Sequence, residues 1–124
     1  MAEQRWISET LFDPDGFRMS YAVDKVLYEV QTEHQHLVLF EHRFFGKMLM
    51  LDGATQVTGK DEFVYHEMMA HVPLFAMDAP RDVLIVGGGD GGVLREVLRH
   101  PSVKKAVMCE IDRGVIDLCT EYFP

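Results

Sequence analysis

The sequence predicts an α/β protein in which a small antiparallel β module precedes the first part of a parallel sheet. Short extended runs separated by turn residues fill the first half of the chain, as in antiparallel sheets. The second half alternates apolar strand-like runs with helical patterns, which is the order typical of parallel sheets. We expect a β module at 1–60, a linking helix at 61–80 and the start of a second domain at 81–124.

The β module is expected to begin with a hairpin. A turn sequence from Asp13 to Gly16 lies between the extended runs WISETLF and FRMSYAV. Further extended runs follow, and they read KVLYEVQT, HLVLFEH, GKMLMLD and ATQVT. Strand content is therefore high in this region, and the runs are expected to form one small antiparallel sheet.

A helical pattern connects the module to the second domain. It begins at Asp61, and Pro80 marks its junction with the next segment. Its large apolar side chains are expected to pack in the core: Phe63, Tyr65, Met68, Met69 and Val72. The polar residues of this region fit either a solvated helix face or a site, and they are Gln56, Asp61, Glu62, Tyr65, His66 and Glu67.

A glycine-rich loop is the centre of the second domain. The run from Val83 to Val86 is wholly apolar, which predicts a strand buried on both faces of a parallel sheet. Five glycines follow within six residues, and Asp90 is the only side chain among them. Glycines allow positive φ angles and close approach of the backbone to a ligand. A helix should follow and end near His100, before a second strand at 103–111 and a second helix.

The loop matches a nucleotide-binding pattern. Gly87, Gly89 and Gly92 fit G-x-G-x-x-G after a strand and before a helix, and Glu110 lies about 20 residues further on. This context predicts a Rossmann-like fold in which Glu110 accepts hydrogen bonds from ribose hydroxyls, with Asp112 as the weaker candidate. The alternative is a glycine turn that binds no ligand.

Asp90 indicates which kind of nucleotide is bound. In a dinucleotide site the pyrophosphate lies over the loop, where backbone N–H groups and the helix dipole favour negative charge. The negative carboxylate of Asp90 would repel a pyrophosphate at this place. An acid suits a ligand that is positive nearby, such as a sulfonium or an amine. The sequence therefore favours S-adenosylmethionine and its relatives over nicotinamide cofactors. Alternatively, Asp90 caps the helix that begins near Gly92.

Composition excludes several classes of partner. The 124 residues carry a formal net charge of −8, which argues against nucleic acid or an anionic membrane as the partner. We see neither a signal peptide nor an apolar run long enough to span a bilayer, and we expect a cytoplasmic protein. Cys109 and Cys119 do not form a C-x-x-C unit, and two reduced, partly buried thiols are expected.

No metal site is expected. His66, Glu67 and His71 resemble H-E-x-x-H, but the two histidines are five residues apart instead of four. On a helix they would lie about 140° apart, so they cannot face one metal ion. His34 and His36 have no third ligand in view and are expected on the surface.

Several separated motifs resemble one enzyme family. The stretches LDGATQVTGKDEFVYHEMMAHVPL, VLIVGGGDGGVLREVLRH and VMCEID, with YAVDKVLYE and TEHQHLVLFE nearer the start, are similar to those of the polyamine aminopropyltransferases, in particular the bacterial spermidine synthases. The resemblance implies transfer of an aminopropyl group from decarboxylated S-adenosylmethionine to putrescine or a similar diamine. It also implies a co-substrate in place of a tightly bound cofactor, and a homo-oligomer, either dimer or tetramer.

The resemblance also assigns roles to single residues. It implies that the nucleoside is held by Gln35, Gln56 and Glu110. Tyr65 and His66 would border the polyamine channel, and Asp90 would bind the aminopropyl ammonium group. In the family the sheet continues for several strands, and the aspartate that acts as base would fall beyond Pro124. The catalytic residue is therefore unassigned, and we expect residues 1–124 alone to be inactive and to associate.

Two other functions remain open at this point. A methyltransferase shares the glycine loop and the acid after the second strand, but it needs neither the β module nor the VYHE segment. A non-catalytic binding or assembly fragment is the other alternative.

Overall fold

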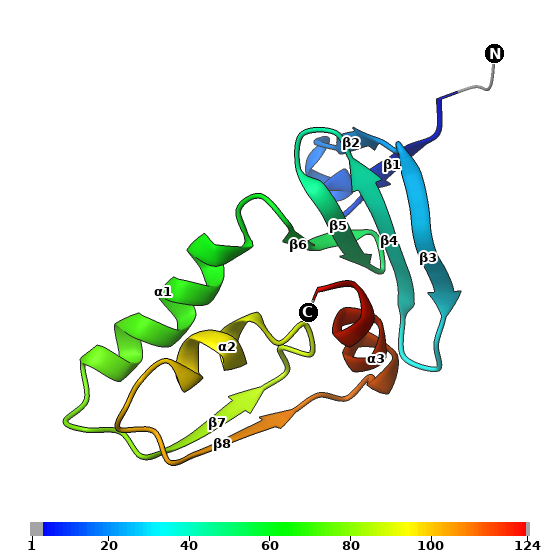
Figure 1. Ribbon diagram of the computed structural model, residues 1–124. Coiled ribbons are helices and arrows are strands. Elements are labelled where there is room, and N and C mark those ends of the chain that lie inside the picture. Colours follow the sequence, from blue (N-terminus) through cyan, green and yellow to red (C-terminus); the bar gives the residue numbers. More distant parts are fainter. Residues whose placement is uncertain (1–3, 124) are drawn as a thin grey trace. The chain divides into compact units, whose positions relative to one another are not determined.

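The structure is a computed structural model, and it describes residues 4–123 of the chain. By its contacts the chain divides into two compact units, and the division falls between Asp61 and Glu62. The first unit contains strands, and the second mixes helices with a parallel sheet (Figure 1). The predicted α/β class, with an antiparallel module before the parallel strands, is confirmed.

The first unit opens with the predicted hairpin. Strands β1 (Trp6–Glu9) and β2 (Met19–Ala22) pair antiparallel. Between them a short 3-10 helix at Asp13–Asp15 ends at Gly16, whose φ of 74° lies in the left-handed region that favours glycine. The turn chemistry of the sequence therefore places this connection correctly.

Four more strands form a second antiparallel sheet, so the expectation of one sheet in this region is wrong. They are β3 (Lys25–Gln31), β4 (His36–His42), β5 (Gly46–Leu51) and β6 (Ala54–Thr58). Val38 lies opposite Met50, and Phe40 lies opposite Met48, so these four side chains share one face. Together with Val23 they form a buried cluster, and burial of each such side chain stabilises the fold by about 1.5–3 kcal/mol.

The second unit contains three helices and two strands in alternating order. They are α1 (Glu62–Phe75), β7 (Asp82–Val86), α2 (Gly92–Leu98), β8 (Lys105–Cys109) and α3 (Arg113–Tyr122). Strands β7 and β8 pair in parallel, and α2 lies in the connection between them (Figure 1). Within residues 4–123 no helix is both long and apolar enough to cross a membrane.

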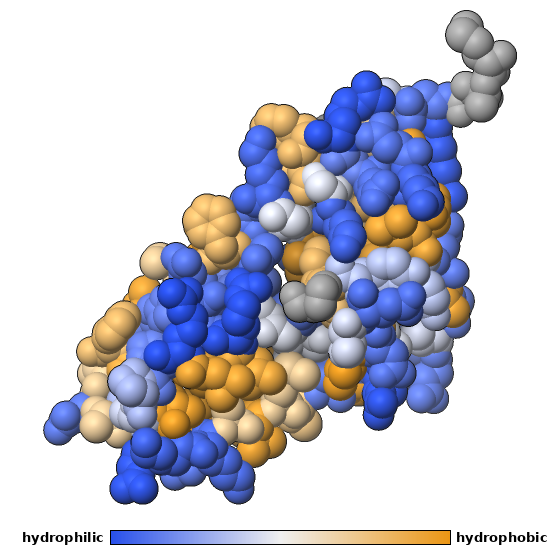
Figure 2. All heavy atoms as spheres, in the orientation of Figure 1, coloured by the Kyte–Doolittle hydropathy of each residue, from blue (hydrophilic) through white to orange (hydrophobic). Residues whose placement is uncertain are grey.

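The parallel sheet is covered on one face. Ala70 and Leu74 of α1 pack with Val97 of α2 and Ile85 of β7 in a buried cluster. On the other face Leu84 and Val86 are 66% and 83% exposed. Figure 2 shows apolar residues on the surface in the lower part of the view, where Figure 1 draws α2, β7 and β8. The expectation of a strand buried on both faces is therefore wrong for the described residues, because α1 and α2 cover one face only.

The buried face of α1 also differs from the prediction. The buried residues of this helix are His66, Ala70 and Leu74, which are spaced four apart and therefore share one side of a helix. The residues that were expected in the core are at least half exposed: Phe63, Tyr65, Met68, Met69 and Val72. The size of an apolar side chain gave no information about which face of the helix meets the sheet.

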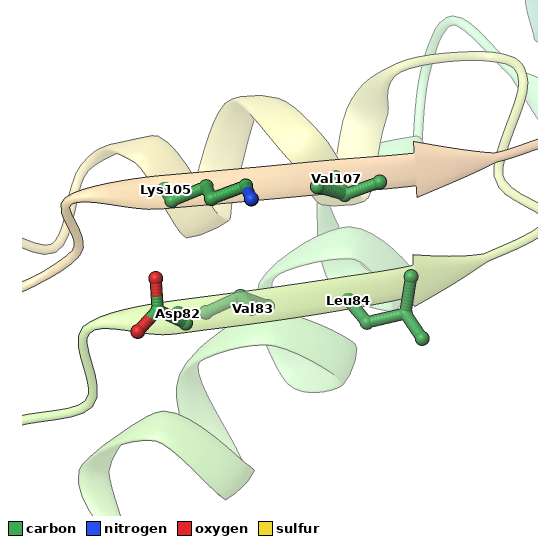
Figure 3. A pocket seen from close by; sticks show the side chains of 5 residues that line it. All are labelled: Asp82, Val83, Leu84, Lys105 and Val107. Atoms are coloured by element: carbon green, nitrogen blue, oxygen red, sulfur yellow. The ribbon is translucent and has the colours of Figure 1, made fainter.

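A shallow hollow lies on the open face of the parallel sheet. Its lining residues are Asp82, Val83, Leu84, Lys105 and Val107 (Figure 3). Asp82 and Lys105 are the first residues of their strands, whereas the glycine loop follows the last residue of β7. Ligands of α/β sheets bind at the carboxyl ends of the strands, so we place the candidate site at the glycine loop.

Candidate functional site

The glycine loop joins the carboxyl end of β7 to the start of α2. Gly87, Gly88 and Gly91 have φ angles of 79°, 74° and 80°. Residues with a Cβ atom rarely adopt these angles, so the backbone path of the loop requires glycine at these three positions.

Two other glycines are required because neighbouring side chains lie against them. A Cβ atom on Gly89 would lie 2.8 Å from Cγ of Glu110 and 2.9 Å from Cγ1 of Val115. A Cβ atom on Gly92 would overlap the imidazole ring of His66. These glycines therefore allow Glu110 and His66 to approach the loop closely, in addition to any approach by a ligand.

Asp90 has one oxygen bound within the protein. Its Oδ1 accepts a hydrogen bond of 2.7 Å from the N–H of Gly92, and Nε2 of His66 lies 3.0 Å from the same oxygen. Asp90 therefore binds the first residue of α2, although the N-cap position of this helix is Gly91 and not Asp90. No contact of Oδ2 with residues 4–123 is recorded, so this second carboxylate oxygen is available to a cationic ligand.

His66 lies between two carboxylates. Its ring is buried, with Nδ1 against Oε2 of Glu62 and Nε2 facing Asp90. Glu62 also accepts a 2.8 Å hydrogen bond from Arg95. Partial burial raises the pKa of Glu62, but the hydrogen bonds from Arg95 and His66 outweigh it, so that pKa lies below its usual range. Tyr65 is exposed beside this group, with its ring centroid 5.6 Å from that of His66.

Glu110 lies directly after β8 and holds two backbone groups. Its Oε2 accepts from the N–H of Gly89 and its Oε1 from the N–H of Asp112, both at 3.0 Å. A carboxylate has about four acceptor sites, so about two remain for ribose hydroxyls. Asp112, the weaker candidate, is buried and caps α3 by accepting from the N–H of Gly114 at 2.9 Å.

The two cysteines differ in their surroundings. Both thiols are free, and Cys119 is buried whereas Cys109 is exposed, so the expectation of two partly buried thiols is wrong for Cys109. Alternate residues of β8 point away from the helices. Burial, and then the charges of Asp90 and Glu110, raises the pKa of Cys119 to about 12. Both carboxylates therefore act on one buried thiol, which indicates that they lie in the same part of the unit.

Gln35 and Gln56 belong to the first unit. Gln35 lies in the turn between β3 and β4, where its N–H donates to Oγ1 of Thr32 at 3.1 Å. Gln56 is exposed on β6, and its Nε2 donates to the carbonyl oxygen of Ala54 at 3.3 Å. The other site residues predicted from the sequence all lie in the second unit, around the glycine loop.

A second polar cluster joins α1 and α2 further from the loop. Nδ1 of His71 lies 2.9 Å from Nε2 of His100, and Nε2 of His71 lies 3.1 Å from Glu96. His66 and His71 thus have different partners, as their spacing predicted. Within residues 4–123 no group of three or more metal-ligating side chains is found.

Sequence reasoning did not identify the partners of His66. Glu62 precedes His66 by four residues, which places the two on one side of α1, and this spacing was the available signal. Arg95 comes from another helix, and no local pattern connects it to Glu62.

Comparisons with known proteins agree with this geometry. A family model for the spermine/spermidine synthase domain matches residues 62–124, and one for the spermidine synthase tetramerisation domain matches residues 5–59. A polyamine aminopropyltransferase of Escherichia fergusonii is 52% identical over 124 residues, which are all of this chain and 42% of that protein. Polyamine aminopropyltransferase 1 of Pseudomonas aeruginosa is 53% identical over 116 residues, which are 94% of this chain and 40% of that protein.

Solved structures give the same result. Spermidine synthase from Thermotoga maritima matches with a TM-score of 0.92 and 43% identity, over 99% of this chain and 44% of its own. A spermidine synthase in complex with the transition state analogue AdoDATO matches with the same score and identity, over 43% of its length. The chain thus spans about two fifths of the length of these relatives. The resemblance found in the sequence is confirmed, and the chain belongs to the spermine/spermidine synthase family.

Proposed function

We propose that this protein transfers an aminopropyl group from decarboxylated S-adenosylmethionine to putrescine or a similar diamine, giving spermidine and 5′-methylthioadenosine. The observation that carries the proposal is the carboxylate of Asp90 among the loop glycines, with Oδ2 uncommitted. A negative group at this point suits a cationic aminopropyl donor. The names of the relatives and the AdoDATO complex of a structural neighbour support the same reaction class.

The chemistry requires binding and alignment of two cations. The neutral amine of the diamine attacks the carbon next to the sulfonium, the C–S bond breaks, and the thioether leaves with the bonding electrons. The new ammonium then loses a proton. Asp90 would bind the ammonium of the aminopropyl group, while Tyr65 and His66 border the path of the diamine. Alignment of nucleophile and sulfonium supplies much of the rate in such reactions.

Glu110 would bind the nucleoside. Its remaining acceptor sites suit the two ribose hydroxyls, because an ionised carboxylate is an acceptor only. Gln35 and Gln56 are proposed for the same nucleoside, and Gly87, Gly89 and Gly92 keep the loop free of side chains beside it. We assign no proton acceptor among residues 4–123.

The test is an activity assay on the protein in its full natural length. With decarboxylated S-adenosylmethionine and putrescine, we expect release of 5′-methylthioadenosine and formation of spermidine, both measured by chromatography. Cadaverine in place of putrescine would test the length of the acceptor. Methyl transfer from intact S-adenosylmethionine, with no 5′-methylthioadenosine from the decarboxylated donor, would instead identify a methyltransferase.

We also propose that the protein is a homo-oligomer, a dimer or a tetramer, assembled through the β module. The match of residues 5–59 to a spermidine synthase tetramerisation domain supports this assembly. Light scattering of the full-length protein measures its mass in solution, and a monomer at micromolar concentration would contradict the proposal.

A further inference from the structure

We propose that Glu62, held by Arg95, is a positioning residue that sets the hydrogens and the orientation of the His66 ring and thereby aims Asp90 at a cationic ligand. The part of this inference that concerns the ring depends on the structure alone. The part that concerns a polyamine ligand rests on the proposed function.

The four side chains form a continuous series. A terminal nitrogen of Arg95 donates to Oε2 of Glu62 at 2.8 Å, and the same oxygen contacts Nδ1 of His66. On the other side of the ring, Nε2 lies 3.0 Å from Oδ1 of Asp90. The series therefore runs from α2 through α1 to the glycine loop.

The contacts determine where the hydrogens are. Arg95 and His66 hold the pKa of Glu62 below its usual range, so this carboxylate is ionised and can only accept. Nδ1 of His66 must therefore carry a hydrogen. Nε2 lies 3.0 Å from Oδ1 of Asp90 in an ion-pair contact, which requires a hydrogen on Nε2 as well, since an unprotonated nitrogen would repel this oxygen. The ring that satisfies both contacts is an imidazolium between two carboxylates, with the charge of Arg95 behind Glu62.

This arrangement also fixes the carboxylate of Asp90. Oδ1 accepts a hydrogen bond from the N–H of Gly92 and lies 3.0 Å from Nε2 of His66 in an ion-pair contact, and these two contacts restrict rotation of the group. Oδ2 is then left as the oxygen that meets a ligand. The ring stays close to the loop because Gly92 has no Cβ atom.

Loss of the carboxylate of Glu62 should free both the ring of His66 and the carboxylate of Asp90. A His66 ring without its Nδ1 partner can adopt the other neutral tautomer or turn about its side-chain bonds. An unprotonated Nε2 would repel Oδ1 of Asp90, and the carboxylate would then leave the orientation that exposes Oδ2. Glu62 therefore acts on the ligand through His66 and Asp90 and not by direct contact.

Two substitutions in the full-length protein test the inference. Glu62→Gln keeps the volume and one acceptor oxygen but removes the charge, and Glu62→Leu removes both. The ring nitrogens of His66 are observed by 15N NMR without ligand across a pH series. Spermidine affinity is measured by calorimetry in the presence of 5′-methylthioadenosine. The control is Asp117→Asn. It also removes a carboxylate that is paired with an arginine, in this case Arg113, but the pair is exposed on α3.

We expect the Gln variant to change the 15N shifts of the His66 ring, since the ionised acceptor of its Nδ1 hydrogen has been replaced by an amide. The Leu variant should show altered nitrogen shifts and bind spermidine about tenfold more weakly, since a hydrogen bond to a charged group has been lost from the series. Affinity for 5′-methylthioadenosine alone, and both properties in the control, should not change.

Any other result with these variants contradicts one part of the inference. Unchanged 15N shifts of His66 in the Gln variant, which preserves the packing, would show that Glu62 does not set the ring hydrogens. Altered nitrogen shifts with unchanged spermidine affinity would show that the ring does not position Asp90. If the parent protein binds no spermidine, the proposed function fails, while the NMR series still decides the role of Glu62 toward His66.

Discussion

The helix pair α1 and α2 contains two histidine clusters that use the same residue types differently. Near the glycine loop, His66 lies between Glu62 and Asp90, and Oδ2 of Asp90 remains available. Further along the helices, His71 lies between Glu96 and His100. In the first cluster Oδ2 of the end carboxylate is open, whereas in the second both oxygens of the buried Glu96 carboxylate are bonded within the protein.

Glu96 shows this closure most clearly. Its side chain is 4% exposed, Oε1 accepts from Arg95 at 2.9 Å, and Oε2 accepts from Arg99 at 2.8 Å. The hydrogen bond from Arg95 lowers the pKa of Glu96 most, and those from Arg99 and His71 lower it further. Burial acts in the opposite direction, and the resulting pKa is about 2. Glu96 accepts three hydrogen bonds within the protein, from Arg95, Arg99 and His71, and its burial closes it to a ligand.

Charge, burial and a histidine do not by themselves indicate a binding site, because both clusters have all three. The feature that differs is position relative to the sheet. Asp90 lies beyond the carboxyl end of β7, where α/β folds bind ligands, whereas His100 follows α2 and precedes β8. Disruption of the second cluster should therefore affect stability, and disruption of the first should affect binding.

The largest expected effect is on stability. Glu96→Gln should lower the free energy of unfolding by about 3 kcal/mol, because the arginines and His71 lose their shared charged acceptor. Chemical denaturation measures this change. Affinity for 5′-methylthioadenosine should be retained under native conditions. A variant as stable as the parent would show that Glu96 does not stabilise the fold.

The stabilising role of Glu96 should also appear in the pH dependence of stability. The pKa of Glu96 is lower in the folded state than its ordinary 4.5, so its contribution is present above that value and is lost as pH falls toward about 2. The free energy of unfolding of the parent protein should decrease between roughly pH 5 and pH 2. The decrease should be smaller in Glu96→Gln, because this variant has no carboxylate to protonate at position 96. An identical decrease in both proteins would contradict this assignment.

The next effect is on nucleoside binding. Glu110→Gln should weaken 5′-methylthioadenosine binding by roughly 1.5–3 kcal/mol, because a charged acceptor of the ribose hydroxyls is replaced by an amide. Calorimetry on the full-length protein measures it, with Asp117→Asn as the exposed control. Putrescine binding alone should change little, and unaltered nucleoside affinity would show that Glu110 only holds the loop.

The smallest effect is on the choice of donor. Intact S-adenosylmethionine carries a carboxylate that would face Asp90, and like charges in a partly desolvated pocket cost on the order of 1–3 kcal/mol. Asp90→Asn should therefore narrow the preference for the decarboxylated donor, as measured by calorimetry with both compounds. Equal discrimination before and after the change would show that selection occurs elsewhere.

Much of the fold was predictable because its signals are local. The turn from Asp13 to Gly16, the β-branched run of β7 and the glycines that follow it act through the backbone of their own segments. The glycine loop also placed Asp90 and Glu110 at the ends of neighbouring parallel strands, because strand order and register follow from the β-α-β connection. These positions form the candidate site.

The α/β class, the loop and its two acids could be predicted from the sequence, since each follows from conformational preferences within a few residues. The buried side of α1 and the residues around His66 depend instead on packing between elements. Ala70 and Leu74 are buried in place of Phe63 and Met69, because the fit of one surface against another depends on both surfaces. Likewise Arg95 reaches Glu62 across 33 residues of chain, and no periodicity within one helix can specify a contact made between two.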